Sequence, residues 1–174
     1  MPGKKDGLKG RLSEITLVDL PKAAVASCEA ISGNPEQESG AMIEAWLEKH
    51  GLRCGENTAC DKEQKGCRSC RIYHQYATLP EGAALAGDDN VAIKEFSGGR
   101  FARIAVRDPF ADCEFPSAWG ILLRWAFKKK IPNRLGCTSK KDCYSLFSNE
   151  ESPCLEEVYW ENGAQYMAMY LPIK

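Results

Sequence analysis

An internal repeat constrains the fold of this chain more than any other feature of its sequence. The segment 72–76 (Ile-Tyr-His-Gln-Tyr) and the segment 155–159 (Leu-Glu-Glu-Val-Tyr) are separated by the same offset as Cys54 and Cys60 are from Cys137 and Cys143. Slightly shorter offsets relate Pro35 to Pro116 and Trp46 to Trp125. A shared order of matched features predicts two similar units that pack on each other. We expect a flexible N-terminus at 1–12 and a single domain at 13–174, with repeat one at about 13–96 and repeat two at about 97–174.

Each repeat is predicted to contain a strand, a helix and two further strands. Repeat one has strands at 23–30, about 71–79 and 91–96, with a helix between the first two. Repeat two has strands at 100–107, 154–160 and 166–171, and its helix opens at Pro116. One more strand, 14–20, precedes both. We predict an α+β fold: an antiparallel sheet with pseudo-two-fold symmetry, two main helices and a central pocket.

Turn and cap residues place the ends of these elements. Asn34 is a good helix cap before Pro35, and Gln37 completes a pattern like a capping box. Gly51 is typical of a helix C-terminus, and Asn162-Gly163 is a strong hairpin signal. The basic run 128–130 suits the C-terminal end of a helix dipole; contact with phosphate or DNA is the alternative.

Composition excludes several classes of protein. Lys and Arg total 23 against 24 for Asp and Glu, whereas a nucleic-acid binder usually has a basic excess. No apolar stretch approaches the roughly 20 residues that span a bilayer. No apolar segment of a signal peptide follows the N-terminal lysines. We therefore expect a cytoplasmic protein that contacts neither nucleic acid nor membrane directly.

Nine cysteines are many for such a chain, and their odd number with no signal peptide favours reduced thiols in a reducing compartment. Cys54, Cys60, Cys67 and Cys70 fall in one predicted loop. The last two have the spacing of a zinc hook, but the other spacings are irregular for structural zinc. Zinc, a disulfide or redox pair, and unligated thiols all stay open for this loop. We predict no cofactor and assign no metal ligand.

The strand around Glu157 carries the clearest candidate site. The common phosphate-loop, dinucleotide and nucleophile-elbow motifs are absent. Side chains alternate along a strand, so Glu157 shares a face with Tyr159, and His74 with Tyr76. If the two faces approach, they form a tyrosine-lined cleft with one carboxylate, which favours a flat cationic ligand or general acid catalysis. The alternative is that Glu157 lies on a solvated face of the sheet.

The sequence also resembles the gyrase-inhibitor-like (GyrI-like) domain, found too as the effector-binding domain of AraC- and MerR-type regulators. The resemblance covers roughly 13–174. It rests on segments 20–22, 46–52, 96–102, 115–119, 157–159 and 170–173. It implies two repeats around a pocket for drug-like, often cationic or aromatic compounds. The family's pocket carboxylate falls at Glu157, beside Tyr159, and Trp119 is a weaker candidate for a pocket wall.

Three functions follow from this resemblance. The first is a stand-alone protein that binds an amphipathic, aromatic or cationic compound, because 1–12 is too short for the DNA-binding region of a regulator. The second is a hydrolase that opens cyclopropane rings in toxic natural products with Glu157 and a nearby tyrosine. The third is a protein-interaction module with gyrase or a transcription regulator as partner. The candidate ligand-binding residues are Glu157, Tyr159, Tyr76, His74 and Trp119.

Overall fold

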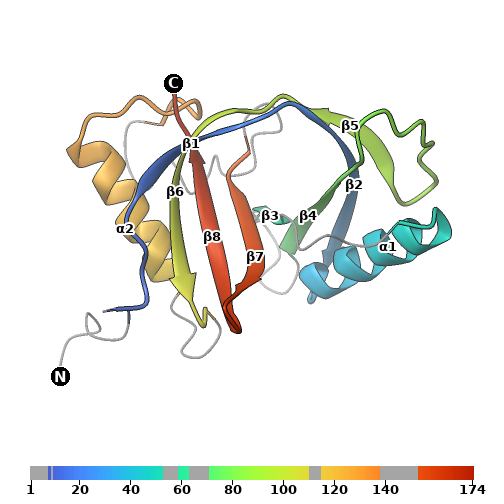
Figure 1. Ribbon diagram of the computed structural model, residues 1–174, viewed down its shortest axis with the longest axis horizontal. Coiled ribbons are helices and arrows are strands. Elements are labelled where there is room, and N and C mark those ends of the chain that lie inside the picture. Colours follow the sequence, from blue (N-terminus) through green and yellow to red (C-terminus); the bar gives the residue numbers. More distant parts are fainter. Residues whose placement is uncertain (1–7, 9, 53–58, 63–70, 110–114, 138–152) are drawn as a thin grey trace.

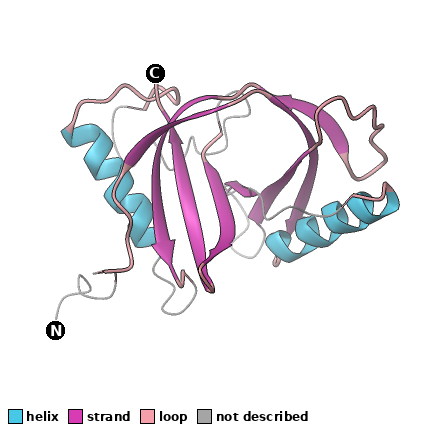
Figure 2. Cartoon of the chain, in the orientation of Figure 1, coloured by secondary structure: helices cyan, strands magenta, loops and turns pink. Residues whose placement is uncertain are grey.

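The computed structural model describes residues 8, 10–52, 59–62, 71–109, 115–137 and 153–174. Within them the elements follow the order β1 (Thr16–Leu20), β2 (Ala23–Ser32), α1 (Pro35–Lys49), β3 (Ala59–Lys62), β4 (Arg71–Thr78), β5 (Ala92–Phe96), β6 (Gly99–Arg107), α2 (Phe115–Lys128), β7 (Leu155–Glu161) and β8 (Ala164–Pro172). The strands form one eight-stranded sheet, and all its pairings are antiparallel. The predicted α+β class, with an antiparallel sheet and two helices, is confirmed (Figures 1 and 2).

The strands lie in the sheet in the order β1-β6-β8-β7-β3-β4-β2-β5, and the two halves of this order correspond to each other. Exchanging β1 with β5, β2 with β6, β3 with β7 and β4 with β8 reproduces the same order read backwards. We call β2, β3, β4, β5 and α1 the α1 half, and β1, β6, β7, β8 and α2 the α2 half. The two helices lie at opposite ends of the long axis of the molecule (Figure 1).

This order corrects the repeat predicted from the sequence. The predicted match paired 72–76 with 155–159, which lie on β4 and β7. In the sheet, however, β4 occupies the place that corresponds to β8, and β3 the place that corresponds to β7. Each unit is also strand-strand-helix-strand-strand, because a strand precedes β2 and another precedes β6. The match was wrong because 59–62 was read as loop, which removed one strand from the first unit.

Two long paired segments join the halves. Strand β1 pairs with β6 and ends at Leu20 opposite Gly99; β2 pairs with β5 and begins at Ala23 opposite Phe96. Two residues separate these pairs on each segment, 21–22 on one and 97–98 on the other, so both ladders share one register. The ribbon of two segments arches from one half to the other (Figure 1).

Gly98 allows these two segments to come close where they cross. Its φ is +65°, a conformation that L side chains rarely adopt. A Cβ atom at this position would lie 2.5 Å from the carbonyl oxygen of Leu20. Glycine is therefore required by both backbone conformation and space.

Alternation along the strands separates an outer from an inner face. On β6, the residues Ala102, Ile104 and Val106 pack under α2, whereas Phe101 and Ala105 belong to a separate inner cluster. Helix α1 covers the outer face of the α1 half through a third cluster that includes Trp46. Each half thus buries its outer face beneath a helix, as period-two strands require, and the inner faces are left to each other.

The turn signals are confirmed with one exception. Asn162 and Gly163 both have positive φ, as a type I′ hairpin requires, and Gly51 has positive φ at the end of α1. Asn34 precedes α1 but makes no side-chain cap. Its amide instead donates to the side chain of Gln37 at 3.1 Å, so the predicted capping box does not form.

Few of the cysteines lie in the described residues. Cys28 is a free, buried cysteine, and burial raises the pKa of its thiol to about 11. Cys154 is also buried. Cys137 is disulfide-bonded, which departs from the expectation of reduced thiols at this position. For the loop cysteines Cys54, Cys60, Cys67 and Cys70, the alternatives of zinc, a disulfide or redox pair, and unligated thiols stay untested, because Cys54, Cys67 and Cys70 lie outside the described residues. No helix in the described part of the chain is long and apolar enough to cross a membrane.

Candidate functional site

A pocket of about 620 Å³ lies where the two halves meet. The crossing segments form one wall through Leu20, Pro21, Ala23 and Val25, and through Lys94, Glu95, Phe96 and Ser97. The rest of the lining is Tyr76 and Thr78 of β4, Leu155 and Glu157 of β7, Tyr170 of β8, and Pro153. The volume is in the range of small-molecule sites.

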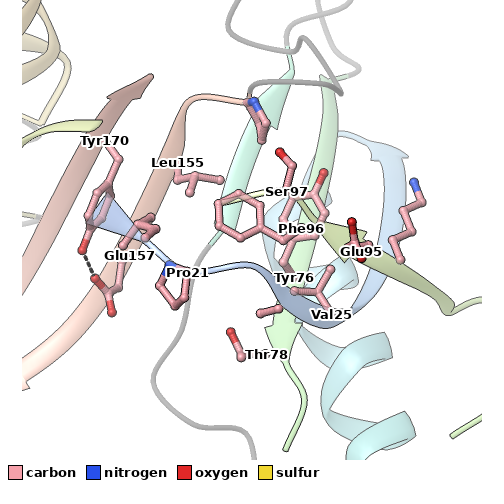
Figure 3. Close-up of a pocket in the computed structure, with 14 residues that line it drawn as sticks. Pro21, Val25, Tyr76, Thr78, Glu95, Phe96, Ser97, Leu155, Glu157 and Tyr170 are labelled. Atoms are coloured by element: carbon pink, nitrogen blue, oxygen red, sulfur yellow. Dashed lines mark hydrogen bonds between the residues drawn. The ribbon is translucent and has the colours of Figure 1, made fainter. Parts of the chain in front are cut away.

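The aromatic rings and the carboxylate of Glu157 lie on opposite sides of the pocket. Phe96, Tyr76 and Val25 lie on one side, together with the polar residues Thr78, Glu95 and Ser97, and Glu157 and Tyr170 lie on the other (Figure 3). Strand alternation aims Glu157 inward with Leu155, and the neighbouring Glu156 accepts a hydrogen bond from the indole of Trp119 on α2. The pocket face of β7 is therefore the odd-numbered one, and the solvated-face alternative for Glu157 does not hold.

The carboxylate of Glu157 is half-buried and is bound by one side chain. The hydroxyl of Tyr170 donates to Oε2 of Glu157. Burial, together with this hydrogen bond, raises the pKa of Tyr170 to about 12. The phenol is therefore protonated at neutral pH, and it can act as a donor to the carboxylate and as a proton source.

A guanidinium completes this polar group behind Tyr170. Nε of Arg103 donates to the Tyr170 hydroxyl at 3.2 Å, and Nη2 donates to the Tyr159 hydroxyl at 2.9 Å. Burial lowers the pKa of Arg103, but the hydrogen bonds to the two phenols outweigh it and the pKa is raised. Arg103 is therefore always charged. Tyr159 also stacks on Tyr166, with ring centroids 5.3 Å apart.

The five candidate residues thus divide between the pocket and its surroundings. Glu157 and Tyr76 line the pocket, whereas Tyr159 is not among its lining residues and accepts a hydrogen bond from Arg103. His74 is buried on β4, where its Nε2 lies 2.8 Å from Oε2 of Glu29. Trp119, on α2, packs in the outer core between that helix and the sheet. His74 and Trp119 are not among the residues that line this pocket, and a ligand role for any of the five stays a prediction.

Tyr170, Arg103 and Phe96 were not predicted as site residues. Tyr170 had a signal in the sequence, because in the predicted hairpin it lies opposite Leu155 and therefore on the same face of the sheet as Leu155 and Glu157. Arg103 sits among apolar residues at 101–106, and a charge in such a strand indicates a built polar contact. Phe96 had no such signal in the sequence, because its place in the pocket depends on where the two paired segments that join the halves cross.

No family model matches the chain, and no curated protein matches it.

Solved structures with the same fold are found across almost the whole chain. The chain in a cryo-EM structure of an EcmrR–DNA complex superposes with a TM-score of 0.59 at 12% identity, over 92% of this chain and 57% of that chain. The present chain thus spans little more than half the length of that protein. A chain described as a hydrolase from Listeria innocua gives a TM-score of 0.57 at 9% identity and covers 92% of both chains.

A third structure was solved with a small organic molecule. SAV2435, bound to tetraphenylphosphonium, matches with a TM-score of 0.52 at 9% identity, over 93% of this chain and 94% of that one. At such identities the likeness shows the fold alone. This chain therefore has a fold similar to that of a DNA-complexed protein, a protein bound to an organic cation and a protein described as a hydrolase.

Proposed function

We propose that this protein is a GyrI-like small-molecule-binding protein that takes up an amphipathic aromatic cation in the pocket between its halves. The observation that carries this proposal is the half-buried carboxylate of Glu157, which lies across the pocket from the aromatic rings of Phe96 and Tyr76. A buried carboxylate needs a partner charge or hydrogen bonds. Tyr170 supplies one hydrogen bond, and a ligand cation would supply the charge.

The pocket suits the two ends of such a ligand. Phe96 and Tyr76 offer aromatic surface that attracts flat or cationic groups, and Glu157 lies across the pocket from them (Figure 3). The likeness to SAV2435, a protein with tetraphenylphosphonium bound, supports this ligand class. The likeness to EcmrR in complex with DNA supports a role as an effector-binding unit in transcription regulation.

Titration with tetraphenylphosphonium tests the proposal. The wild-type protein is expected to bind it saturably. Glu157→Gln, which keeps the shape of the side chain but removes its charge, is expected to lose about tenfold in affinity, or about 1.4 kcal/mol. Triphenylphosphine oxide, a neutral compound with similar rings, should bind both proteins equally.

Glu161→Gln is the matched control for this experiment. Glu161 is an exposed carboxylate on the same strand, outside the pocket lining. Its substitution removes the same net charge and should change the affinity for tetraphenylphosphonium by less than about twofold. Equal losses in the two variants would mean that the overall charge of the protein acts, and the proposal would be wrong.

A second candidate function is hydrolysis of a strained cyclopropane ring in a toxic natural product. The favouring observation is the hydrogen bond that joins a carboxylate and a protonated phenol in one pocket. Glu157 would take a proton from water as the water oxygen bonds to a ring carbon. Tyr170 would give its proton to the other carbon as the ring bond breaks, and Glu157 would return a proton to Tyr170. The sum is the addition of one water.

Turnover distinguishes the two functions. A cyclopropane-bearing aromatic compound incubated with the protein should gain the mass of one water, as measured by mass spectrometry, if the protein is a hydrolase. Glu157→Gln and Tyr170→Phe should each abolish that gain. Recovery of the compound unchanged, with saturable binding, leaves ligand binding as the function.

A further inference from the structure

Arg103 is a half-buried cation on the inner face of β6, and its contacts are with tyrosines. Among the described residues, no carboxylate lies within ion-pair distance of its guanidinium. Its contacts are two phenol oxygens, and it lies over the rings of the same tyrosines, 5.5 Å from the centroid of Tyr159 and 5.7 Å from that of Tyr170. Aromatic rings and phenols, rather than an acid, hold this side chain in place.

Chemistry fixes the direction of every hydrogen bond in this group. A guanidinium carries only donors, so Arg103 must donate to the oxygen of Tyr170. A phenol has a single proton, and the oxygen of Tyr170 already accepts from Arg103. An ionised carboxylate only accepts, so the proton of Tyr170 points to Glu157. The order is therefore Arg103 to Tyr170 to Glu157, and it ends on the carboxylate that lines the pocket.

We propose that Arg103 is a positioning residue that acts through Tyr170 to hold the carboxylate of Glu157 oriented toward a cationic ligand. The inference rests on the proposed function of the pocket. Tyr170 occupies Oε2 of Glu157, and in the described part of the chain no other side chain bonds to that carboxylate. Oε1 is thus available to the ligand. A donor on the phenol oxygen also makes the phenol a stronger donor to the carboxylate.

The relay from Arg103 through Tyr170 to Glu157 and simple charge repulsion predict opposite changes in the affinity for a cationic ligand when Arg103 is removed. A cation beside the pocket repels a cationic ligand, so its removal should tighten binding if only Coulomb forces act. Lys94, which lines the pocket and is exposed, has that role alone. Lys94→Met should tighten binding of tetraphenylphosphonium by up to about twofold, because exposed charges are strongly screened. Arg103→Met should instead weaken it by about tenfold, because Glu157 loses its support.

The binding experiment uses both variants with the charged and the neutral probe. Binding of triphenylphosphine oxide should be unchanged in Arg103→Met, which separates loss of charge selectivity from loss of the pocket. Arg103→Lys keeps a donor and should recover part of the affinity for tetraphenylphosphonium. If Arg103→Met does not fold, Arg103→Gln replaces it, since its shorter side chain cannot bridge both phenols and the same sign is expected.

A double-mutant cycle tests whether Arg103 acts through Tyr170. In a Tyr170→Phe background the relay is already broken, so Arg103→Met should cause no further loss of affinity for tetraphenylphosphonium. Additive losses in the cycle would overturn the inference. Equal or tighter binding in Arg103→Met would overturn it as well.

Proton NMR of the ligand-free protein provides a readout that does not depend on the proposed function. The hydroxyl proton of Tyr170 should give a downfield signal that Tyr170→Phe removes. Arg103→Met should move that signal upfield, because the bond to Glu157 weakens. An unchanged signal means that Arg103 does not position this proton, even if the pocket binds cations. Failure of wild-type protein to bind tetraphenylphosphonium, with the signal moving as expected, rejects the ligand class and not the relay.

Discussion

Tyr76 and Tyr170 occupy corresponding places in the two halves, but their surroundings differ. In the α1 half, Ser27 stands between Ala92 of β5 and Tyr76 of β4. In the α2 half, Arg103 stands in the same place between Thr16 of β1 and Tyr170 of β8. Both tyrosines line the pocket.

The difference between the halves shows how a nearly symmetric sheet obtains an asymmetric site. A serine has no charge to place beside the pocket, whereas an arginine aligns a phenol and a carboxylate. In the next rung, Glu29 faces His74 in one half and Ala105 faces Ala168 in the other. Glu29 and His74 of the α1 half are not among the residues that line the pocket. Tyr170 and Glu157 of the α2 half both line it. A ligand is expected to direct its charge to the α2 half and its rings to the α1 half.

The largest expected effect concerns the crossing that brings the two halves together. Gly98→Ala should lower the free energy of unfolding by more than about 2 kcal/mol, because the new Cβ adds strain at positive φ to a backbone clash. Gly163→Ala, also at positive φ but with no atom within 4 Å of the new Cβ, should cost about 1 kcal/mol. Urea unfolding measures both. Equal costs would mean that the crossing is not under steric constraint.

The next effect tests the comparison of the two tyrosines directly. Tyr170→Phe removes the proton donor of Glu157 and should weaken binding of tetraphenylphosphonium by about threefold to tenfold. Tyr76→Phe keeps the ring on the aromatic side and should change that affinity by less than about twofold. Fluorescence titration of both variants gives the result, and equal losses would remove the distinction between the halves.

The smallest expected effect is a pH dependence of stability. The pKa of Tyr170 is raised from its usual 10.0 to about 12, first by burial and then by its bond to Glu157. The folded state therefore holds this proton more tightly than the unfolded state. Its contribution to stability is complete below about pH 10 and is lost as the pH rises from about 10 to about 12. Urea unfolding across that range should give a shallower decline for Tyr170→Phe than for wild type. Identical declines would contradict the assignment.

Much of the fold could be predicted because the signals are local. Strand limits, both helices and the hairpin at Asn162-Gly163 follow from periodicity and turn residues. Alternation along 155–159 placed Glu157 and Tyr159 on one face, but it left open whether that face is solvated, and the pocket place of Glu157 was implied by the family resemblance. The short strand β3 was missed because Ala59–Lys62 has little apolar or β-branched character, and pairing with β4 and β7 rather than propensity makes it a strand.

The site itself was only partly predicted. Glu157 and Tyr76 lie in the pocket, whereas Trp119 was a candidate only through the family resemblance. A large apolar ring on the inner side of a helix is usually buried in the core, and Trp119 is buried between α2 and the sheet. No pattern in the sequence indicated that Arg103 would meet Tyr159 and Tyr170, because those residues are more than fifty positions away.

The α+β class and the two helices follow from the sequence, since these depend on hydrophobic periodicity and turn chemistry within a few residues. The tertiary structure alone decided which strands correspond, where the two long segments cross, and which side chains from β6, β7 and β8 share one polar group. Such contacts depend on strand order and register, which neighbouring residues in the chain do not encode. The asymmetry of the proposed ligand site therefore arises where the halves meet.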